Sequence, residues 1–194
     1  VKVEKKKSPF LKFPFQRDET FVRDFGGAFV VAKTPSYGVI LHTGPIGHQD
    51  PNDGLLQYTS PMGFGGGQLS AFWTPATGSV ILGRRGGMIH GKPFDKPEEW
   101  RLWPIHAVSG CTPAGKAFSS AGIQKPAVTA KLKKNTGVVT VSGVIAGDEL
   151  FQGKVLAGTM SYIRVFEVER GKLRVETKVA ASGQDKITEL YETI

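Results

Sequence analysis

The strongest constraint on the fold comes from two stretches of alternating side chains near the carboxyl end of the chain. In SYIRVFEVER (161–170), every second residue from Tyr162 to Val168 falls on one face of an extended backbone. In GKLRVETKVAA (171–181), apolar or β-branched residues alternate with charged ones in the same way. Two such stretches joined through Arg-Gly-Lys predict a tight antiparallel hairpin.

Shorter stretches of the same kind recur along the whole chain, whereas no long apolar repeat of helical period is present. Phe72-Trp73-Thr74-Pro75 followed by Gly78 predicts a second hairpin, because proline favours a turn and glycine supplies a positive φ. Gly143 is expected to mark a bulge or a close approach within its strand. Only 96–103 suggests a short helical turn. The strands are expected at 26–33, 37–43, 68–74, 79–85, 101–109, 127–135, 137–146 and 185–194.

Many short strands separated by turn signals predict an all-β chain, namely an antiparallel β-sandwich of ordinary or extended size with long Gly-rich loops. Glycine accounts for 25 of the 194 residues, which fits a chain rich in turns. The connections 43–67 and 86–100 are long for a sandwich. Loops of that length are uncommon unless they are functional or disordered, so they are the first places to search for a site.

The net charge of +8 is concentrated at the amino end, where the first 17 residues carry six basic side chains and one acidic one. This distribution predicts a basic arm or linker at 1–20 and a single sandwich domain at 21–194. It disfavours a nucleic-acid binder, which needs a basic face on the folded domain. Because the chain starts at Val1 and ends within a strand-like stretch, we expect it to be a segment of a larger protein.

The single Cys111 excludes an internal disulfide framework, which fits either a cytosolic protein or a periplasmic or surface protein that folds without disulfides. A nucleophilic role for Cys111 would require a nearby base that the sequence does not place. No apolar run reaches the ~18 residues of a membrane-spanning helix.

Three residues of the first long loop and its entry are the candidate catalytic residues: His42, His48 and Tyr58. Histidine and tyrosine can act as general acid or base when they line a cleft. The alternative is that residues 50–53 (DPND), which follow His48, simply form a turn, and that Tyr58 packs its ring at the rim of a cleft. Neither His-x-His nor HExxH spacing occurs, so no cofactor is expected, although a divalent metal near His48 and Asp50 stays open.

The candidate substrate-binding residues are Trp73, Arg84, Arg85 and His90. A guanidinium matches a carboxylate or sulfate, and an indole ring stacks on a sugar. The alternatives are a solvated turn for the arginines and burial for the tryptophan. The Gly-Gly-Gly run at 65–67 lacks the GK[ST] of a phosphate-binding loop, so unusual backbone torsions are its expected role.

The stretches GGGQLSAFWTPATGSVILGRRGG (65–87) and KITELYETI (186–194) resemble the β-sandwich portion of polysaccharide lyases of the heparinase II/III type. The resemblance implies β-elimination on a uronic acid, in which a tyrosine or histidine abstracts the proton next to the carboxylate and a cation neutralises that carboxylate. It implies these roles for Tyr58, for His42 or His48, and for Arg84 or Arg85.

The leading hypothesis is a β-sandwich domain of a periplasmic or extracellular carbohydrate-active protein that binds an acidic polysaccharide or processes it by β-elimination. The alternative is a non-catalytic structural or interaction module that packs on another domain or chain of the same protein. A cytosolic enzyme that uses Cys111 is the third hypothesis.

Overall fold

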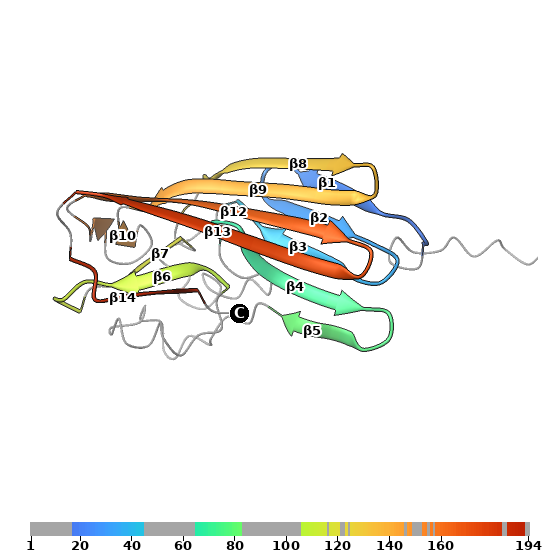
Figure 1. Ribbon diagram of the computed structural model, residues 1–194, viewed down its shortest axis with the longest axis horizontal. Coiled ribbons are helices and arrows are strands. Elements are labelled where there is room, and N and C mark those ends of the chain that lie inside the picture. Colours follow the sequence, from blue (N-terminus) through green and yellow to red (C-terminus); the bar gives the residue numbers. More distant parts are fainter. Residues whose placement is uncertain are drawn as a thin grey trace, which may run out of the picture.

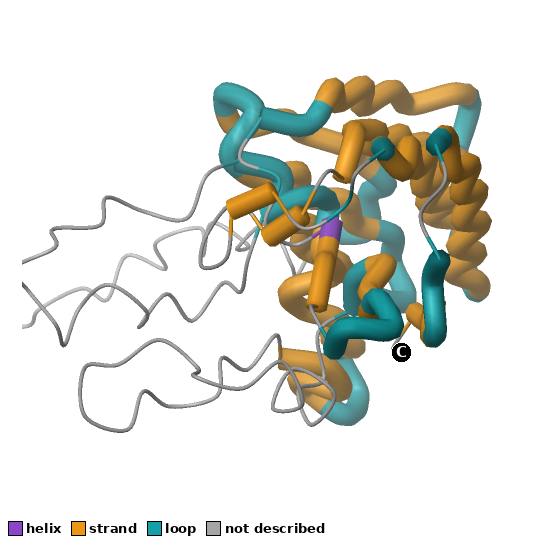
Figure 2. Tube along the Cα trace, turned by 90° about the vertical axis from the view of Figure 1, so that its left-hand side faces the viewer, coloured by secondary structure: helices purple, strands orange, loops and turns teal. Residues whose placement is uncertain are grey.

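The computed structural model describes residues 17–44, 65–82, 106–115, 117–120, 123, 125–145, 147–148, 153–154, 156, 158–183 and 186–192. Within these ranges the chain consists of strands and loops, apart from a short 3₁₀ piece at Ser120 (Figure 2). All strand pairs are antiparallel, which confirms the predicted all-β sandwich.

The first large sheet has five strands in the order β1-β2-β3-β4-β5, each paired with its neighbour in sequence. The second has four strands in the order β13-β12-β9-β8. In Figure 1 the four-stranded sheet lies over β1 to β3, while β4 and β5 extend beyond it. The strands of the two sheets are β1 Phe21–Phe25, β2 Phe29–Lys33, β3 Gly38–His42, β4 Gln68–Thr74, β5 Gly78–Leu82, β8 Ala127–Lys133, β9 Thr136–Ile145, β12 Thr159–Glu169 and β13 Lys172–Ser182.

The apolar core lies between these two sheets, because each contributes the alternate residues of its strands to one continuous cluster. The five-stranded sheet supplies Val30, Ala32, Val39 and Leu41 among others, all with no exposed surface. The four-stranded sheet supplies further fully buried side chains, including Val139, Val141, Phe166 and Val168.

Two small sheets lie at one end of the sandwich (Figure 1). A three-stranded sheet has the order β14-β6-β7, and a two-stranded one pairs β10 with β11 and lies beside β7. Their strands are β6 Val108–Cys111, β7 Ala117–Ser119, β10 Gly147–Asp148, β11 Gly153–Lys154 and β14 Glu189–Glu192. No helix in the described part of the chain is long and apolar enough to cross a membrane.

Both predicted hairpins are confirmed. Strands β12 and β13 pair in unbroken register from Glu169↔Lys172 to Thr159↔Ser182. Strands β4 and β5 turn through Gly78, whose φ is 70°. Gly143 is a point of close approach and not a bulge, because β9 and β12 stay in register while an added Cβ would meet the Tyr162 ring at 2.8 Å.

Several predicted strands have different bounds in the structure. Within the described residues, the strand expected at 101–109 is present at 108–109, as the start of β6 (Val108–Cys111), and the one expected at 185–194 is present at Glu189–Glu192. Strand β1 was not expected, because its sequence FVRDF is short and places two charged residues in succession. Residues 17–20, assigned to the basic arm, lie against the sandwich, where the buried Lys33 donates hydrogen bonds to the carbonyls of Arg17 and Glu19.

Candidate functional site

The outer face of the five-stranded sheet carries aromatic side chains. Because Val30, Ala32, Val39 and Leu41 point into the core, the residues that alternate with them point away from it. The strand register aligns these outward residues across β1 to β4. We call this set the outer aromatic face; its members are Phe21, Arg23, Phe25, Phe29, Val31, Ile40, Ala71 and Trp73.

Trp73 lies flat on the sheet because Gly38 faces it across the β3–β4 pair. A Cβ at Gly38 would overlap the indole ring, so only glycine leaves room for this arrangement. The indole remains half-buried. A half-exposed ring laid flat against a backbone is a geometry suited to stacking on a planar or apolar ligand surface.

The β1 edge of the face is the more exposed part. Phe25 is 51% exposed, and Arg23 is exposed with its guanidinium carbon 5.9 Å from the centre of the Phe21 ring. Arg23 therefore offers a cation beside an aromatic ring at the β1 edge of the face, and Trp73 lies three strands further across, on β4.

The predicted catalytic residue His42 lies on the same side of the sheet as Trp73, but in a covered part of it. Its ring stacks on Phe29 with centroids 4.6 Å apart, and the residue is 2% exposed. It pairs with Gln68, which is 1% exposed. His42 lies four residues along β3 from Gly38, which corresponds to about 13 Å of extended strand from the Trp73 position. A catalytic role for His42 stays a prediction.

The other predicted site residues, His48, Tyr58, Arg84, Arg85 and His90, lie outside the described residues, as does Asp50. The loops 43–67 and 86–100 and the helical turn at 96–103 lie wholly or largely outside them as well. Of the predicted set, the structure therefore places only His42 and Trp73. It places both on the outward side of the five-stranded sheet.

A polar cluster that sequence reasoning missed lies inside the molecule, around Arg164. The Arg164 side chain has no exposed surface. Its Nη1 donates to the carbonyl of Gly67 at 2.7 Å and to that of His106 at 2.8 Å, and its Nη2 contacts Glu192 Oε1 at 2.5 Å. Gly67 directly precedes β4, His106 lies before β6, and Glu192 is on β14. Because Arg164 itself is on β12, its guanidinium connects three sheets.

The charges of this cluster are set by its burial. Desolvation lowers the pKa of His106 to about 3, and the positive charge of Arg164 lowers it further, so the imidazole is neutral. The Nδ1 atom of the neutral His106 ring then accepts a hydrogen bond from Arg164 Nη2 at 2.6 Å. Burial raises the pKa of Tyr162, whose hydroxyl donates to the Gly66 carbonyl. Glu192 also accepts from the Thr177 hydroxyl at 3.1 Å.

In a cleft, the residue types in this cluster could act as general acid or base. Here they instead hold the three sheets together in the interior of the protein. Arg164 is fully buried and His106 is 6% exposed, so a polymer has no access to them. His106 is a buried histidine whose ring nitrogen is satisfied by Arg164. An arginine within the inward-facing alternation of β12 is the sequence signal that could have located the cluster.

The Gly-Gly-Gly run has the backbone role expected from the sequence. Gly66 and Gly67 have φ values of 70° and 84°, which favour glycine. Their carbonyls accept hydrogen bonds from Tyr162 and Arg164, respectively.

The described residues contain no group of three or more His, Cys, Asp or Glu side chains that could hold a metal ion. Comparisons with protein families, with curated proteins and with solved structures find no match for this chain.

Proposed function

We propose that this chain is the β-sandwich part of an extracytoplasmic carbohydrate-active protein, and that its outer aromatic face binds an acidic polysaccharide. The observation that carries the proposal is the partly exposed Trp73 indole lying flat on Gly38, on the same outward face of the sheet as the exposed Arg23 and Phe25. Aromatic rings stack on the apolar faces of sugar rings, and a guanidinium pairs with a carboxylate.

The comparison of the two outer faces supports placing the site on the five-stranded sheet. The outward positions of the four-stranded sheet carry no aromatic side chain, and the exposed large apolar residues at those positions are Val144 and Ile163. A flat β-face of that composition offers no ring for stacking, whereas the outer aromatic face has rings on β1, β2 and β4.

Affinity electrophoresis and titration calorimetry with alginate, polygalacturonate and hyaluronate, with dextran as the neutral control, test the proposal. Trp73→Ala should weaken binding about tenfold, because a stacked aromatic contributes on the order of 1 kcal/mol beyond its area. Arg23→Gln should weaken binding and reduce its dependence on salt. Val144→Ala, which changes the opposite face, is the matched control and should bind like the parent protein.

Incubation of the protein with the same polymers distinguishes binding alone from β-elimination. Release of an unsaturated uronate, followed by its ultraviolet absorbance, would support the lyase version, with His42→Ala and Tyr58→Phe as the variants to compare. Binding without such release leaves a binding module. Failure to retard or titrate with any acidic polymer would overturn the proposal in favour of a structural module that packs on another domain.

A further inference from the structure

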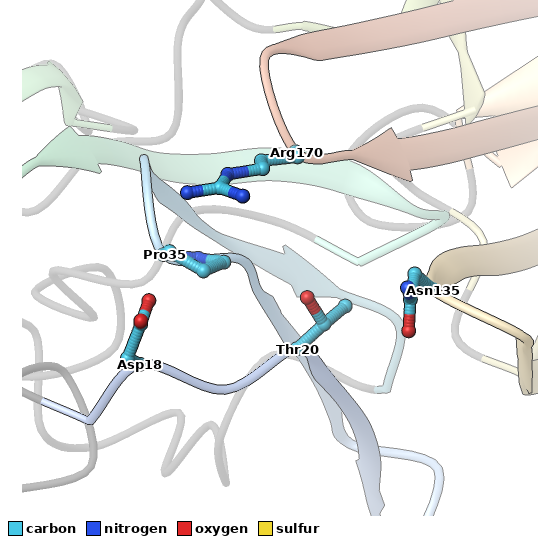
Figure 3. A pocket seen from close by; sticks show the side chains of 5 residues that line it. All are labelled: Asp18, Thr20, Pro35, Asn135 and Arg170. Carbon is cyan, nitrogen blue, oxygen red and sulfur yellow. The ribbon is translucent and has the colours of Figure 1, made fainter.

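A polar hollow of about 260 Å³ lies at one end of the sandwich, where four segments distant in sequence meet. They are the segment before β1, the β2–β3 corner, the β8–β9 turn and the β12–β13 turn. Figure 3 shows the Arg170 guanidinium extending across the hollow near Pro35, with Asp18 and Thr20 below it and Asn135 at the other side. We call it the end hollow; its lining residues are Asp18, Thr20, Pro35, Asn135 and Arg170.

The first wall is held by a buried lysine. Lys33 is 2% exposed, and its Nζ donates to the carbonyls of Arg17 at 2.7 Å and Thr34 at 3.0 Å, with a longer bond to that of Glu19. These bonds satisfy a buried ammonium with carbonyls and fix the backbone on both sides of Asp18. The position of the Asp18 backbone is therefore built into the fold.

The second wall is held by a bond between two corners. The Thr34 hydroxyl accepts from the backbone N–H groups of Ser36 and Tyr37, which shapes the corner that carries Pro35. The Tyr37 hydroxyl donates to the carbonyl of Lys172 at 2.5 Å, next to the turn that carries Arg170. The β2–β3 corner and the β12–β13 turn are thus held together.

The third wall contains a backbone conformation that is unusual for its residue. Strands β8 and β9 are joined by the two-residue turn Lys134–Asn135, and Lys134 has a φ of 57°. Left-handed backbone at a non-glycine residue is uncommon. The next residue, Asn135, lines the hollow.

Three polar residues that line the hollow, Asp18, Asn135 and Arg170, are exposed. Among the residues that the structure describes, none bonds to the Arg170 guanidinium, the Asp18 carboxylate or the Asn135 amide. By contrast, Arg174 on the same hairpin is paired with Glu167 and Glu176. A fixed backbone frame, with polar side chains that have no partner among the described residues, is the arrangement expected of a preorganised site.

The charges limit the kind of ligand. Arg170 suits a carboxylate, whereas Asp18 accepts hydrogen bonds only and repels a second negative charge. Thr20 and Asn135 can each donate to and accept from hydroxyl groups. A monoanion with several hydroxyl groups meets these requirements, and a phosphate or sulfate dianion does not. The volume lies below the ~300–1,000 Å³ of sites for drug-sized molecules, so the ligand is a single small unit.

We propose that the end hollow binds one hydroxylated carboxylate of the size of a sugar acid, with its carboxylate on Arg170 and a hydroxyl group on Asp18. The choice of a sugar acid, but not the site itself, rests on the proposed polysaccharide function. The site is distinct from the outer aromatic face, because Trp73 does not line it.

The test is a titration of the full chain, followed by ¹H–¹⁵N NMR, with D-glucuronate and D-galacturonate, and with D-glucose and L-serine as comparisons. The expected result is saturable shifts of Asp18, Thr20, Asn135 and Arg170 with at least one sugar acid and none with glucose. Arg170→Gln should weaken the affinity at least tenfold, Arg170→Lys less, and Asp18→Ala severalfold. Arg174→Gln, which removes a guanidinium from the same hairpin, is the matched control and should titrate like the parent protein.

The outcomes separate this proposal from the proposed function. Absence of saturable shifts at the end hollow with both sugar acids, in a protein with a native spectrum, overturns the end-hollow proposal even if polymers bind. Tighter binding of serine than of both sugar acids overturns the assignment to a sugar acid. Loss of polymer binding in Trp73→Ala with retained sugar-acid shifts supports two separate sites. Sugar-acid shifts without polymer binding in the parent protein would leave the end hollow standing and the outer aromatic face refuted.

Discussion

Arg164 and Arg170 lie six residues apart, on β12 and on the turn that follows it, yet their surroundings are opposite. Arg164 is fully buried and contacts Gly67, His106 and Glu192. Arg170 is exposed on the end hollow and bonds to no residue in the described part of the chain. The first guanidinium belongs to the interior of the fold and the second is open to solvent.

The difference follows from what burial demands of a charge. A guanidinium removed from water must recover its lost hydration from acceptors, so Arg164 is surrounded by two carbonyls, an imidazole and a carboxylate, and only its Nε lacks a partner. A guanidinium in water needs no protein acceptor, so the unpaired state of Arg170 has little effect on folding. Buried polar clusters therefore indicate stability, and open unpaired ones indicate binding.

The largest expected effect is that of Arg164→Met. Loss of the cation leaves Glu192 partly buried without its partner and removes the bond to Gly67, so the free energy of unfolding should fall by about 3 kcal/mol or more. Urea denaturation followed by tryptophan fluorescence measures the change. A loss below about 1 kcal/mol would contradict the structural role.

A matched pair of variants refines this prediction. Arg174→Met removes an exposed guanidinium of β13 and should change stability by no more than about 0.5 kcal/mol. Arg164→Met combined with Glu192→Gln should recover part of the loss, because no unpaired charge then remains in the cluster.

The second prediction concerns pH. The pKa of His106 is lowered to about 3 in the folded state, against an ordinary value near 6.5 in the unfolded chain. Between these values the unfolded state binds the extra proton, so stability is lost as the pH falls from about 6.5 toward 3, by up to about 1.4 kcal/mol per pH unit from this group. His106→Gln should reduce that slope in denaturation curves recorded at pH 7, 6, 5 and 4. An unchanged slope would mean that His106 is not buried as a neutral group.

The sequence predicts the faces of the strands better than it predicts the sites. The alternation in 161–170 predicts that Tyr162, Arg164, Phe166 and Val168 share one face, and in the structure all four are buried. The same alternation gives no indication of what Arg164 contacts, because its partners come from segments 28 to 97 residues away. Long-range pairing depends on how the sheets pack, which local periodicity does not encode.

The end hollow was missed for a related reason. Its lining residues come from four segments that are distant in sequence. In its own stretch of sequence, each lining residue is of a type that is common in turns. The outer aromatic face was closer to being predictable, since Trp73 was a candidate and Phe21, Phe25 and Phe29 share its outward phase. The sequence did not predict strand β1. Without that strand, the alignment of the aromatic residues across the sheet could not be predicted.

The third prediction concerns Lys134 at the rim of the end hollow. Its φ of 57° suits glycine, so Lys134→Gly should raise the free energy of unfolding by up to about 1 kcal/mol, less the entropy that glycine adds to the unfolded chain. Lys134→Ala retains a Cβ and should not give this gain, which makes it the control. Thermal unfolding monitored by circular dichroism checks both variants. Equal melting temperatures for all three proteins would show that this turn stores no strain.

The smallest expected effect completes the contrast between the two arginines. Arg170→Gln should leave the free energy of unfolding within about 0.5 kcal/mol of the parent value, because the guanidinium is exposed and bonds to no described residue. Urea denaturation of this variant beside Arg164→Met measures the difference directly. A loss comparable to that of Arg164→Met would mean that Arg170 holds the turns together, and its place in the end hollow would then be structural. A near-zero change would leave ligand binding as the property in which Arg170 is expected to matter.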